Sequence, residues 1–167
     1  MSVIVRRAGR RDLDAIRSLW RTLREHEAKL DPRLGLSSDA EAIAAEHREI
    51  ILADPRTALF VAEERGAIVA YLHAQIDAND PSREPARYGT IVDLIVSEER
   101  RREGIAGRLL GAAREWLDSH AVAELRVTLS VADREARAFL EDRGARRVAA
   151  RYVLDSGDGT GSSSGSG

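Results

Sequence analysis

The chain has 167 residues, with 26 basic and 28 acidic side chains and a formal charge of −2. Its length fits one ordinary domain, and the near balance of charge is not typical of a nucleic-acid binder, which usually carries a basic excess. Cysteine is absent, the four histidines are scattered, and there is neither a membrane-spanning apolar run nor an N-terminal leader, so we expect a cytoplasmic protein with no disulfide, metal or membrane partner.

The first third of the chain predicts a short strand and two helices. Residues 2–7 alternate apolar and charged side chains, as in a strand. Asp12 is the expected N-cap of a helix over 13–30, whose apolar side chains recur at helical spacing. A capping box formed by Ser38 and Glu41 predicts a second helix over 39–53.

The rest of the chain alternates strands and helices. The predicted elements are strands over 57–63, 67–76 and 88–96, a helix over 104–120, a strand over 124–131, a helix over 133–143 closed by Gly144, and a strand over 145–154. Residues 156–167 are almost all Ser and Gly and are expected to be a flexible tail. This order places one mixed sheet between helices, an α/β or α+β fold.

The stretch from 91 to 110 carries the clearest functional signal. A buried strand runs into a turn rich in Arg and Gly, and a helix begins at Gly104. Such a junction presents unpaired backbone N–H groups and the positive end of the helix dipole, for which a phosphate is a natural ligand. Gly104 and Gly107 leave room for a pyrophosphate, and three arginines over 100–102 add positive charge. An ordinary turn with solvated arginines explains the same spacing, so both interpretations stay open.

A Walker loop is excluded because the chain has no Gly-Lys-Ser/Thr tripeptide, and a dinucleotide fingerprint is excluded because the three glycines of G-x-G-x-x-G are missing. The sequence Arg101-x-x-Gly104-x-Ala106 instead resembles the Gln/Arg-x-x-Gly-x-Gly/Ala signature of GNAT acetyltransferases, and a strand ending in Asp-Leu-x-Val precedes it at 93–96. The next block is similar to the strand and short helix that follow in this family. Its matching residues are Asp133, Ala136, Phe139, Leu140, Glu141 and Gly144. Because the element order agrees from about residue 3 to 155, the resemblance implies a GNAT domain over 1–155.

The resemblance implies a mixed, mostly antiparallel central sheet flanked by helices, with a V-shaped split between the strands over 88–96 and 124–131. Acetyl-CoA, as co-substrate, would lie in that split. Its pantetheine amides would pair with the backbone of 94–96, and its pyrophosphate would rest on 101–107. The residues implied in cofactor binding are Leu94, Ile95, Val96, Arg101, Arg102, Glu103, Gly104, Ile105, Ala106, Gly107 and Asp133.

A protonated amine cannot attack a thioester, so acetyl transfer needs a base or a water relay. Asp93 is the first candidate, because it is a carboxylate in an otherwise apolar strand beside the implied thioester. Two other roles for Asp93 stay open: electrostatic binding of the amine, and closure of a polar pocket. Glu25, His26 and Glu27 are the runners-up, with a solvated helix face as the simpler explanation for each. His73 fits a hydrogen-bonded core histidine better than a base.

One position departs from the family pattern. Many members place a tyrosine acid where this chain has Leu140, which cannot protonate the departing thiolate. Water, Tyr88 or Tyr152 would have to replace it, unless the thiolate leaves without an acid. Asp133 stands where Asn is common, and it keeps helix capping but loses the amide donor.

The resemblance implies N-acetylation of a primary amine, and the short C-terminal ending is similar to members that act on small molecules. The acidic residues Asp77, Asp80 and Glu84 favour a cationic acceptor. Two alternatives stay open: acetylation of a protein N-terminus or lysine, and a non-catalytic acyl-CoA-binding regulatory domain, which Leu140 motivates. Dimers are common in this family, so a homodimer is one assembly to expect.

Overall fold

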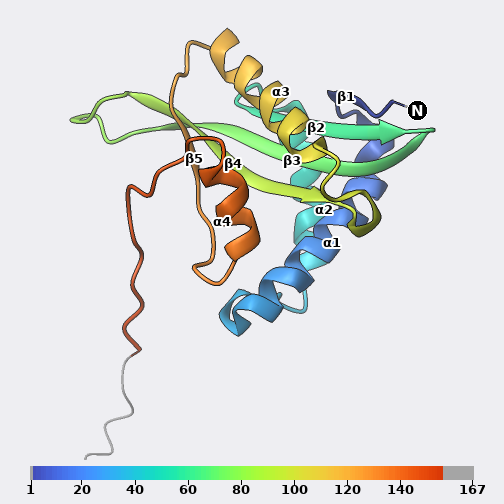
Figure 1. Ribbon diagram of the computed structural model, residues 1–167, viewed down its shortest axis with the longest axis horizontal. Helices are drawn as coiled ribbons and strands as arrows, with labels where there is room; N and C mark the ends of the chain where they lie inside the picture. The colour runs from blue at the N-terminus through green and yellow to red at the C-terminus, as the bar shows by residue number, and fades with distance from the viewer. Residues whose placement is uncertain (1, 156–167) are drawn as a thin grey trace, which may run out of the picture. The chain divides into compact units, whose positions relative to one another are not determined.

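Five strands form one sheet in the order β1-β2-β3-β4-β5 (Figure 1). The computed structural model describes residues 2–155, which fall into two compact units, 2–134 and 135–155. The sheet belongs to the first unit, and its strands are β1 (Ile4–Arg7), β2 (Thr57–Glu64), β3 (Ala67–Ala78), β4 (Arg87–Val96) and β5 (Leu125–Val127). The first four pair antiparallel and β5 runs parallel to β4, which confirms the predicted mixed, mostly antiparallel sheet.

Helices cover both faces of this sheet (Figure 1). On one face lie α1 (Leu13–Leu30) and α2 (Ala40–Ala53), whose apolar stripes meet the strands. The buried cluster on that face consists of Ile16, Trp20, Ile51, Leu59, Val61, Tyr71 and Ile95. On the other face, α3 (Ile105–Ser119) packs Leu117 against Gly89 of β4. Alternate side chains of each central strand therefore point either to the layer of α1 and α2 or to the layer of α3.

A β-bulge at Val92 reverses the side-chain alternation along the last part of β4. Residues after the bulge therefore point to the opposite face from the one that an unbroken strand would give them. Ile91 pairs with Ala74 and Asp93 pairs with His73, so two steps along β4 match one step along β3. Side chains alternate between the two faces along a strand, and a bulge inserts one residue into that alternation. Asp93 therefore lies on the face under α1 and α2, whereas Ile91 lies on the α3 face.

The strand β5 is shorter than predicted, because the strand expected over 124–131 spans only Leu125–Val127. It pairs with the segment from Gly89 to Ile91 of β4. Beyond Ile91, β4 continues to Val96, and β3 is its one strand partner among the described residues. The sheet is therefore split between β4 and β5, as the resemblance implied.

Two helix starts differ from the sequence pattern. Asp12 lies at the N-cap of α1, but its side chain does not cap that helix and accepts a hydrogen bond from Arg6 Nη1 at 2.8 Å. The Arg6 guanidinium lowers the pKa of this buried carboxyl below its ordinary value. The capping box predicted from Ser38 and Glu41 is wrong, because Glu41 instead accepts from Arg21 Nε of α1 at 2.6 Å. In both cases an arginine from another element takes the carboxylate that the sequence pattern assigned to a helix cap.

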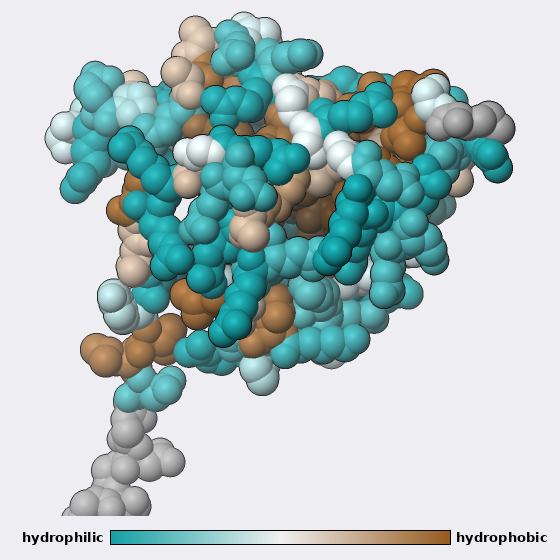
Figure 2. Space-filling model, in the orientation of Figure 1, coloured by the Kyte–Doolittle hydropathy of each residue, from teal (hydrophilic) through white to brown (hydrophobic). Residues whose placement is uncertain are grey.

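The helix α4 (Arg134–Glu141) leads into the second unit, where Gly144 has the left-handed φ of +84° expected after a helix. The strand predicted over 145–154 is wrong, because no described residue pairs with this segment. A strand needs a partner for its backbone N–H and C=O groups, which side-chain alternation alone does not supply. Apolar side chains such as Tyr152 and Leu154 are exposed there, and Figure 2 shows brown hydrophobic side chains shortly before the grey residues, with hydrophilic atoms between them.

None of the described helices is long and apolar enough to cross a membrane. The tail predicted over 156–167 lies outside the described residues, and the single domain over 1–155 stays a prediction.

The contact between Gly89 and Leu117 generates a stability prediction. A Cβ at Gly89 would lie 2.5 Å from Leu117 Cδ1, and Leu117 is itself buried. We expect Gly89→Ala to lower the free energy of unfolding by about 1–3 kcal/mol through overpacking. Gly111→Ala is the matched control, because a Cβ there meets no atom within 4 Å and the site lies inside α3; helix propensity should make it neutral or stabilising by up to about 1 kcal/mol. Urea unfolding of both variants checks this, and equal effects would contradict the packing argument.

Candidate functional site

The free edge of β4 lies next to the loop that joins it to α3. Beyond Ile91, β4 has no partner on the β5 side within residues 2–155, so backbone groups on that edge are available to an extended ligand. Arg101 Nε, from the loop, donates to Val96 O at 3.4 Å. The three residues from Leu94 to Val96, predicted to pair with pantetheine, therefore lie where a peptide-like ligand can add to the sheet.

The loop before α3 leaves a run of backbone N–H groups without acceptors. No N–H from Arg102 to Gly107 donates a hydrogen bond within the described part of the chain, and the first bond of α3 runs from Arg108 N to Gly104 O at 3.1 Å. Arg102 and Gly104 have φ of +63° and +79°, and left-handed residues of this kind build the anion-binding turns called nests. A Cβ added at Gly104 would meet no atom within 4 Å. This loop therefore offers consecutive donors and open space to one anion.

Part of the positive charge at this loop is used within the protein. Arg100 pairs with Glu64 at 2.6 Å and with Glu103 at 3.0 Å, so its charge is compensated. Arg101 and Arg102 are exposed, and neither forms an ion pair with any residue that the structure describes. The charges of these two side chains are therefore available to an anionic ligand, although Arg101 Nε also donates to Val96 O, whereas the side chain of Glu103 is held by Arg100.

The remaining predicted cofactor residues differ in what they can contribute. Ile105 is buried in the core, so only its backbone is available to a ligand. Ala106 and Gly107 are half-buried in the first turn of α3. Asp133 lies in another environment, with Oδ2 at 3.9 Å from Nε2 of His26, one of the runner-up bases. The structure thus brings 101–107 together in one loop and the helix turn that follows it, and places Asp133 near His26 of α1.

Asp93 is buried, and both of its carboxylate oxygens accept hydrogen bonds. Arg24 Nη2 of α1 donates to Oδ1 at 2.5 Å, and the Tyr71 hydroxyl of β3 donates to Oδ2 at 3.0 Å. Burial and the negative charge of Asp93 raise the pKa of Tyr71 well above its ordinary value, so the hydroxyl stays protonated and donates. Arg24 also donates to Glu27, another runner-up base, at 2.6 Å. The candidate base is therefore a carboxylate fixed in place by two donors.

Two further polar side chains are buried on the same face as Asp93. His73, its partner across the β3–β4 register, is 5% exposed, and its Nε2 has no hydrogen-bond partner among the described residues. Burial lowers the pKa of His73, so its imidazole is neutral at pH 7. Arg48 of α2 is 7% exposed and its Cζ lies 4.9 Å from the centre of the Trp20 ring. The core histidine expected at 73 is thus buried, but Nε2 lacks the expected bond.

Sequence reasoning missed Tyr71, Arg24 and Arg48. Tyr71 lies in an apolar strand and gave no signal. Arg48 did leave one, because it lies three residues before the buried Ile51 and so occupies the apolar stripe of α2. A basic residue on such a stripe indicates a buried charge with a function or a partner.

The other candidate acids and bases form no hydrogen bond with Asp93 among the described residues. Glu25 is exposed on α1. Tyr88 lies at the end of β4 that pairs with β5, where the guanidinium of Arg126 stacks 3.7 Å from the centre of its ring. Leu140 and Tyr152 belong to the second unit. Among the side chains considered in the first unit, Asp93 and His73 are the two that share a buried face.

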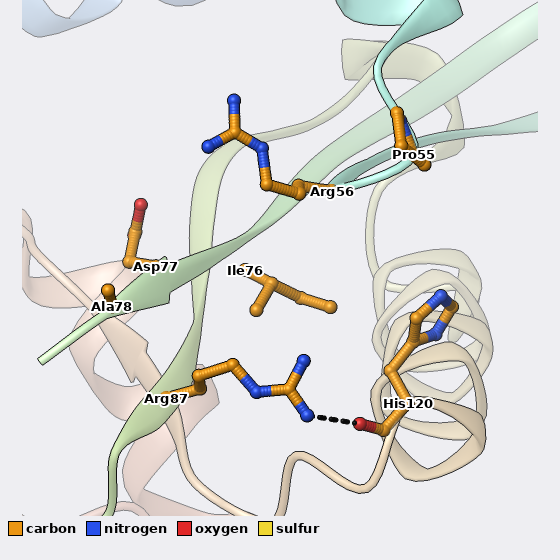
Figure 3. A pocket seen from close by; sticks show the side chains of 7 residues that line it. All are labelled: Pro55, Arg56, Ile76, Asp77, Ala78, Arg87 and His120. Carbon is orange, nitrogen blue, oxygen red and sulfur yellow. Dashed lines mark hydrogen bonds between the residues drawn. The ribbon is translucent and has the colours of Figure 1, made fainter.

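Two pockets lie near the opposite end of β4. One, of about 470 Å³, is lined by Asn79, Arg83, Glu84 and Arg126. The other, of about 310 Å³, is lined by Pro55, Arg56, Ile76, Asp77, Ala78, Arg87 and His120. Figure 3 shows Arg56 and Arg87 on either side of Ile76, and Arg87 Nη2 donates to His120 O at 2.9 Å. Both pockets involve the strand ends near 78 and 87, whereas the free donors lie beyond Val96.

Two of the acidic residues expected to favour a cationic acceptor, Asp77 at the end of β3 and Asp80 in the loop after it, already accept hydrogen bonds within the protein. Asp77 accepts from Thr90 Oγ1 at 2.6 Å and from Gln75 Nε2 at 2.9 Å, and Asp80 accepts from Ser82 N at 2.8 Å. No group of three or more His, Asp or Glu side chains within residues 2–155 is arranged to hold a metal ion.

A split sheet with unpaired amides at the start of the following helix has the geometry that suits a phosphate-bearing ligand beside a strand edge. The model of the acetyltransferase (GNAT) family matches residues 15–145. The chain belongs to the GNAT acetyltransferase family.

Three similar proteins illustrate this membership. The chain is 26% identical over 140 residues to the uncharacterized N-acetyltransferase YhfO of Bacillus subtilis (strain 168), covering 84% of this chain and 87% of that protein. A predicted acetyltransferase from Clostridium acetobutylicum, solved with acetyl-CoA, superposes with a TM-score of 0.78 at 17% identity, over 92% of this chain and 96% of that chain. Aminoglycoside 6'-N-acetyltransferase AAC(6')-Ig from Acinetobacter haemolyticus superposes with a TM-score of 0.73 at 18% identity, over 90% of this chain and 96% of that chain. The two structural matches show a shared fold.

The open space at Gly104 yields a test of the loop. We expect Gly104→Glu to weaken acetyl-CoA binding by about 100-fold, because a carboxylate and its bulk would oppose charge-assisted hydrogen bonds to phosphate. Isothermal titration calorimetry measures the affinity. Gly66→Glu is the matched control, since Gly66 also has a left-handed φ, of +82°, and open space around it; it introduces the same strain and charge in the β2–β3 turn. Equal affinities for the two variants would remove the loop from the site.

Proposed function

We propose that the chain is an acetyl-CoA-dependent N-acetyltransferase that acetylates a primary amine of a small molecule by direct attack in a ternary complex. The observation that carries the proposal is the run of unpaired backbone N–H groups from Arg102 to Gly107 beside the free edge of β4. Membership of the GNAT family supports acetyl transfer, and a protein of the same fold is named as an aminoglycoside N-acetyltransferase. A cytoplasmic location and a homodimer stay predictions.

The residues present suit the parts of acetyl-CoA. The amides of 102–107 and the side chains of Arg101 and Arg102 would hold the pyrophosphate. The backbone edge from Leu94 to Val96 would hold the amide-bearing pantetheine arm in the manner of an added strand. When bound, acetyl-CoA supplies an acetyl group as a thioester. The proposed alignment brings that thioester to the bulged part of β4, next to Asp93.

The protein's part in the chemistry is to orient the amine and to take its proton. An ammonium group must first lose a proton to become a nucleophile, and Asp93 is the proposed acceptor. Its bonds to Arg24 and Tyr71 fix the carboxylate before any substrate arrives. The amine nitrogen then forms a bond to the carbonyl carbon, the carbon–sulfur bond breaks, coenzyme A leaves as a thiolate, and the nitrogen loses its second proton to solvent to give the neutral amide. Asp93 can also act as an anion that attracts the ammonium form, and its substitution separates these two roles.

The enzyme assignment is tested by measuring thiol release from acetyl-CoA across a panel of amines and of peptides with free N-termini or lysines. Turnover of small amines supports the proposal. Turnover confined to peptides would replace it with protein acetylation. Saturable acetyl-CoA binding without turnover of any amine or peptide would instead identify an acyl-CoA-binding regulatory domain.

Substitution of Asp93 tests the base. We expect Asp93→Asn to lower kcat by about 100-fold and to leave the Kd of acetyl-CoA within about twofold, because the carboxamide keeps the shape but cannot accept the proton. Asp77→Asn is the control, since Asp77 is a carboxylate of β3 whose bonds lie outside the Asp93 cluster; its kcat should not change. If the pH dependence and kcat of Asp93→Asn match the wild type and only KM for the amine rises, Asp93 binds the ammonium and is not the base.

A further inference from the structure

The buried face under α1 and α2 holds one cation whose hydrogen-bonding capacity is not used. Arg24 and Arg48 both lie over the Trp20 ring, with Cζ at 5.7 and 4.9 Å from its centre. Arg24 donates to Asp93 and Glu27, so its charge is matched by carboxylates. Arg48 is 7% exposed, forms no ion pair with a described residue, and its Nη2 is buried without a hydrogen-bond partner in residues 2–155.

An arginine in this condition is costly to keep. Burial of a charge without a paired anion is unfavourable, and an unmade hydrogen bond at a buried donor adds to the cost. Stacking on Trp20 stabilises the face of the guanidinium, but the N–H groups point outward in its plane and are not satisfied by the ring. Burial lowers the pKa of Arg48, which the negative charges of Asp93 and Glu41 offset only in part. The guanidinium of Arg48 therefore lacks a hydrogen-bond acceptor that matches its planar, forked N–H groups.

The position of Arg48 relates that missing acceptor to the reaction. The bulge at Val92 places Asp93 on the face that α2 covers, and Arg48 lies over the same Trp20 ring as Arg24, whose guanidinium donates to Asp93. A molecule whose amine lies at Asp93 therefore has Arg48 among its neighbours on this face. A carboxylate matches the guanidinium fork in shape, charge and number of acceptors.

We propose that the acceptor is a primary amine that also bears a carboxylate, and that Arg48 is the residue that binds this carboxylate. This inference rests on the proposed function and specifies its substrate class. It differs from the cationic acceptor that the acidic loop residues favoured, because Asp77 and Asp80 accept hydrogen bonds inside their own loop and strands. The pairing also assigns separate tasks to the two arginines: Arg24 orients Asp93, and Arg48 selects the substrate.

A matched set of acceptors tests the inference on the wild-type chain. The set contains amino acids, their carboxamides, and the corresponding amines without the carboxyl group, and thiol release from acetyl-CoA is measured for each. Loss of a charge-assisted pair should make the carboxamide about 10- to 150-fold poorer in kcat/KM than the acid. Equal use of acid and carboxamide, or turnover confined to amines without a carboxylate, would overturn the inference.

Variants of Arg48 separate substrate binding from a structural effect. Arg48→Met should raise KM for the acid by the same 10- to 150-fold and leave kcat/KM for the carboxamide within about twofold. Arg48→Lys keeps the charge but not the forked N–H groups, and its KM for the acid should lie between those of the wild type and Arg48→Met. Arg21→Met is the control, because Arg21 is an arginine of the same helical layer whose partner is Glu41; it should not change the preference for acids. A purely structural role would lower activity toward acid and carboxamide alike.

Calorimetric titration with acetyl-CoA distinguishes failure of the Arg48 assignment from failure of the proposed function. If acetyl-CoA binds and amines without a carboxylate are acetylated as well as the acids, the proposed function stands and the assignment of Arg48 is overturned. If acetyl-CoA does not bind, the proposed function fails, and the assignment fails with it.

Discussion

The single inserted residue at Val92 is the constraint on which the site depends. Without it, Asp93 would follow Ile91 onto the face covered by α3, and its carboxylate would be directed into an apolar layer. With it, Asp93 meets Tyr71 from the neighbouring strand and Arg24 from α1. The same stretch of β4 is where pairing with β5 ends. One local irregularity is thus associated with both an accessible strand edge and a buried polar cluster.

The sequence predicts best those features that are fixed by neighbours in the chain. The loop before α3 is of this kind, since Gly104 and the helix that follows set its amides by backbone conformation alone. The predicted strand over 145–154 fails for the opposite reason: its side-chain alternation is local, but strand formation needs a distant partner. The capping box at Ser38 fails similarly, because Arg21 offers Glu41 a stronger partner from another helix.

The polar cluster around Asp93 illustrates what pattern reasoning cannot reach. The two residues that bond Asp93 lie 22 and 69 positions away in the sequence, and a one-residue offset decides which face they share. Apolar alternation along β4 does not specify that offset, because both faces of this strand are covered. Asp93 itself is recognisable as a polar residue in an apolar strand. Its partners become recognisable only when α1 and α2 are placed on the sheet.

The parallel pairing of β4 with β5 requires a crossover connection, and α3 supplies it. The loop that would receive the cofactor therefore belongs to one contiguous segment, from β4 to β5. The side chains proposed to meet the acceptor, apart from Asp93 itself, come from α1 and α2, which precede that segment in the chain. In the proposed enzyme, cofactor binding and acceptor choice thus depend on different stretches of sequence. Exchange of the N-terminal helical pair among relatives is a route by which new acceptors can be acquired on an unchanged cofactor frame.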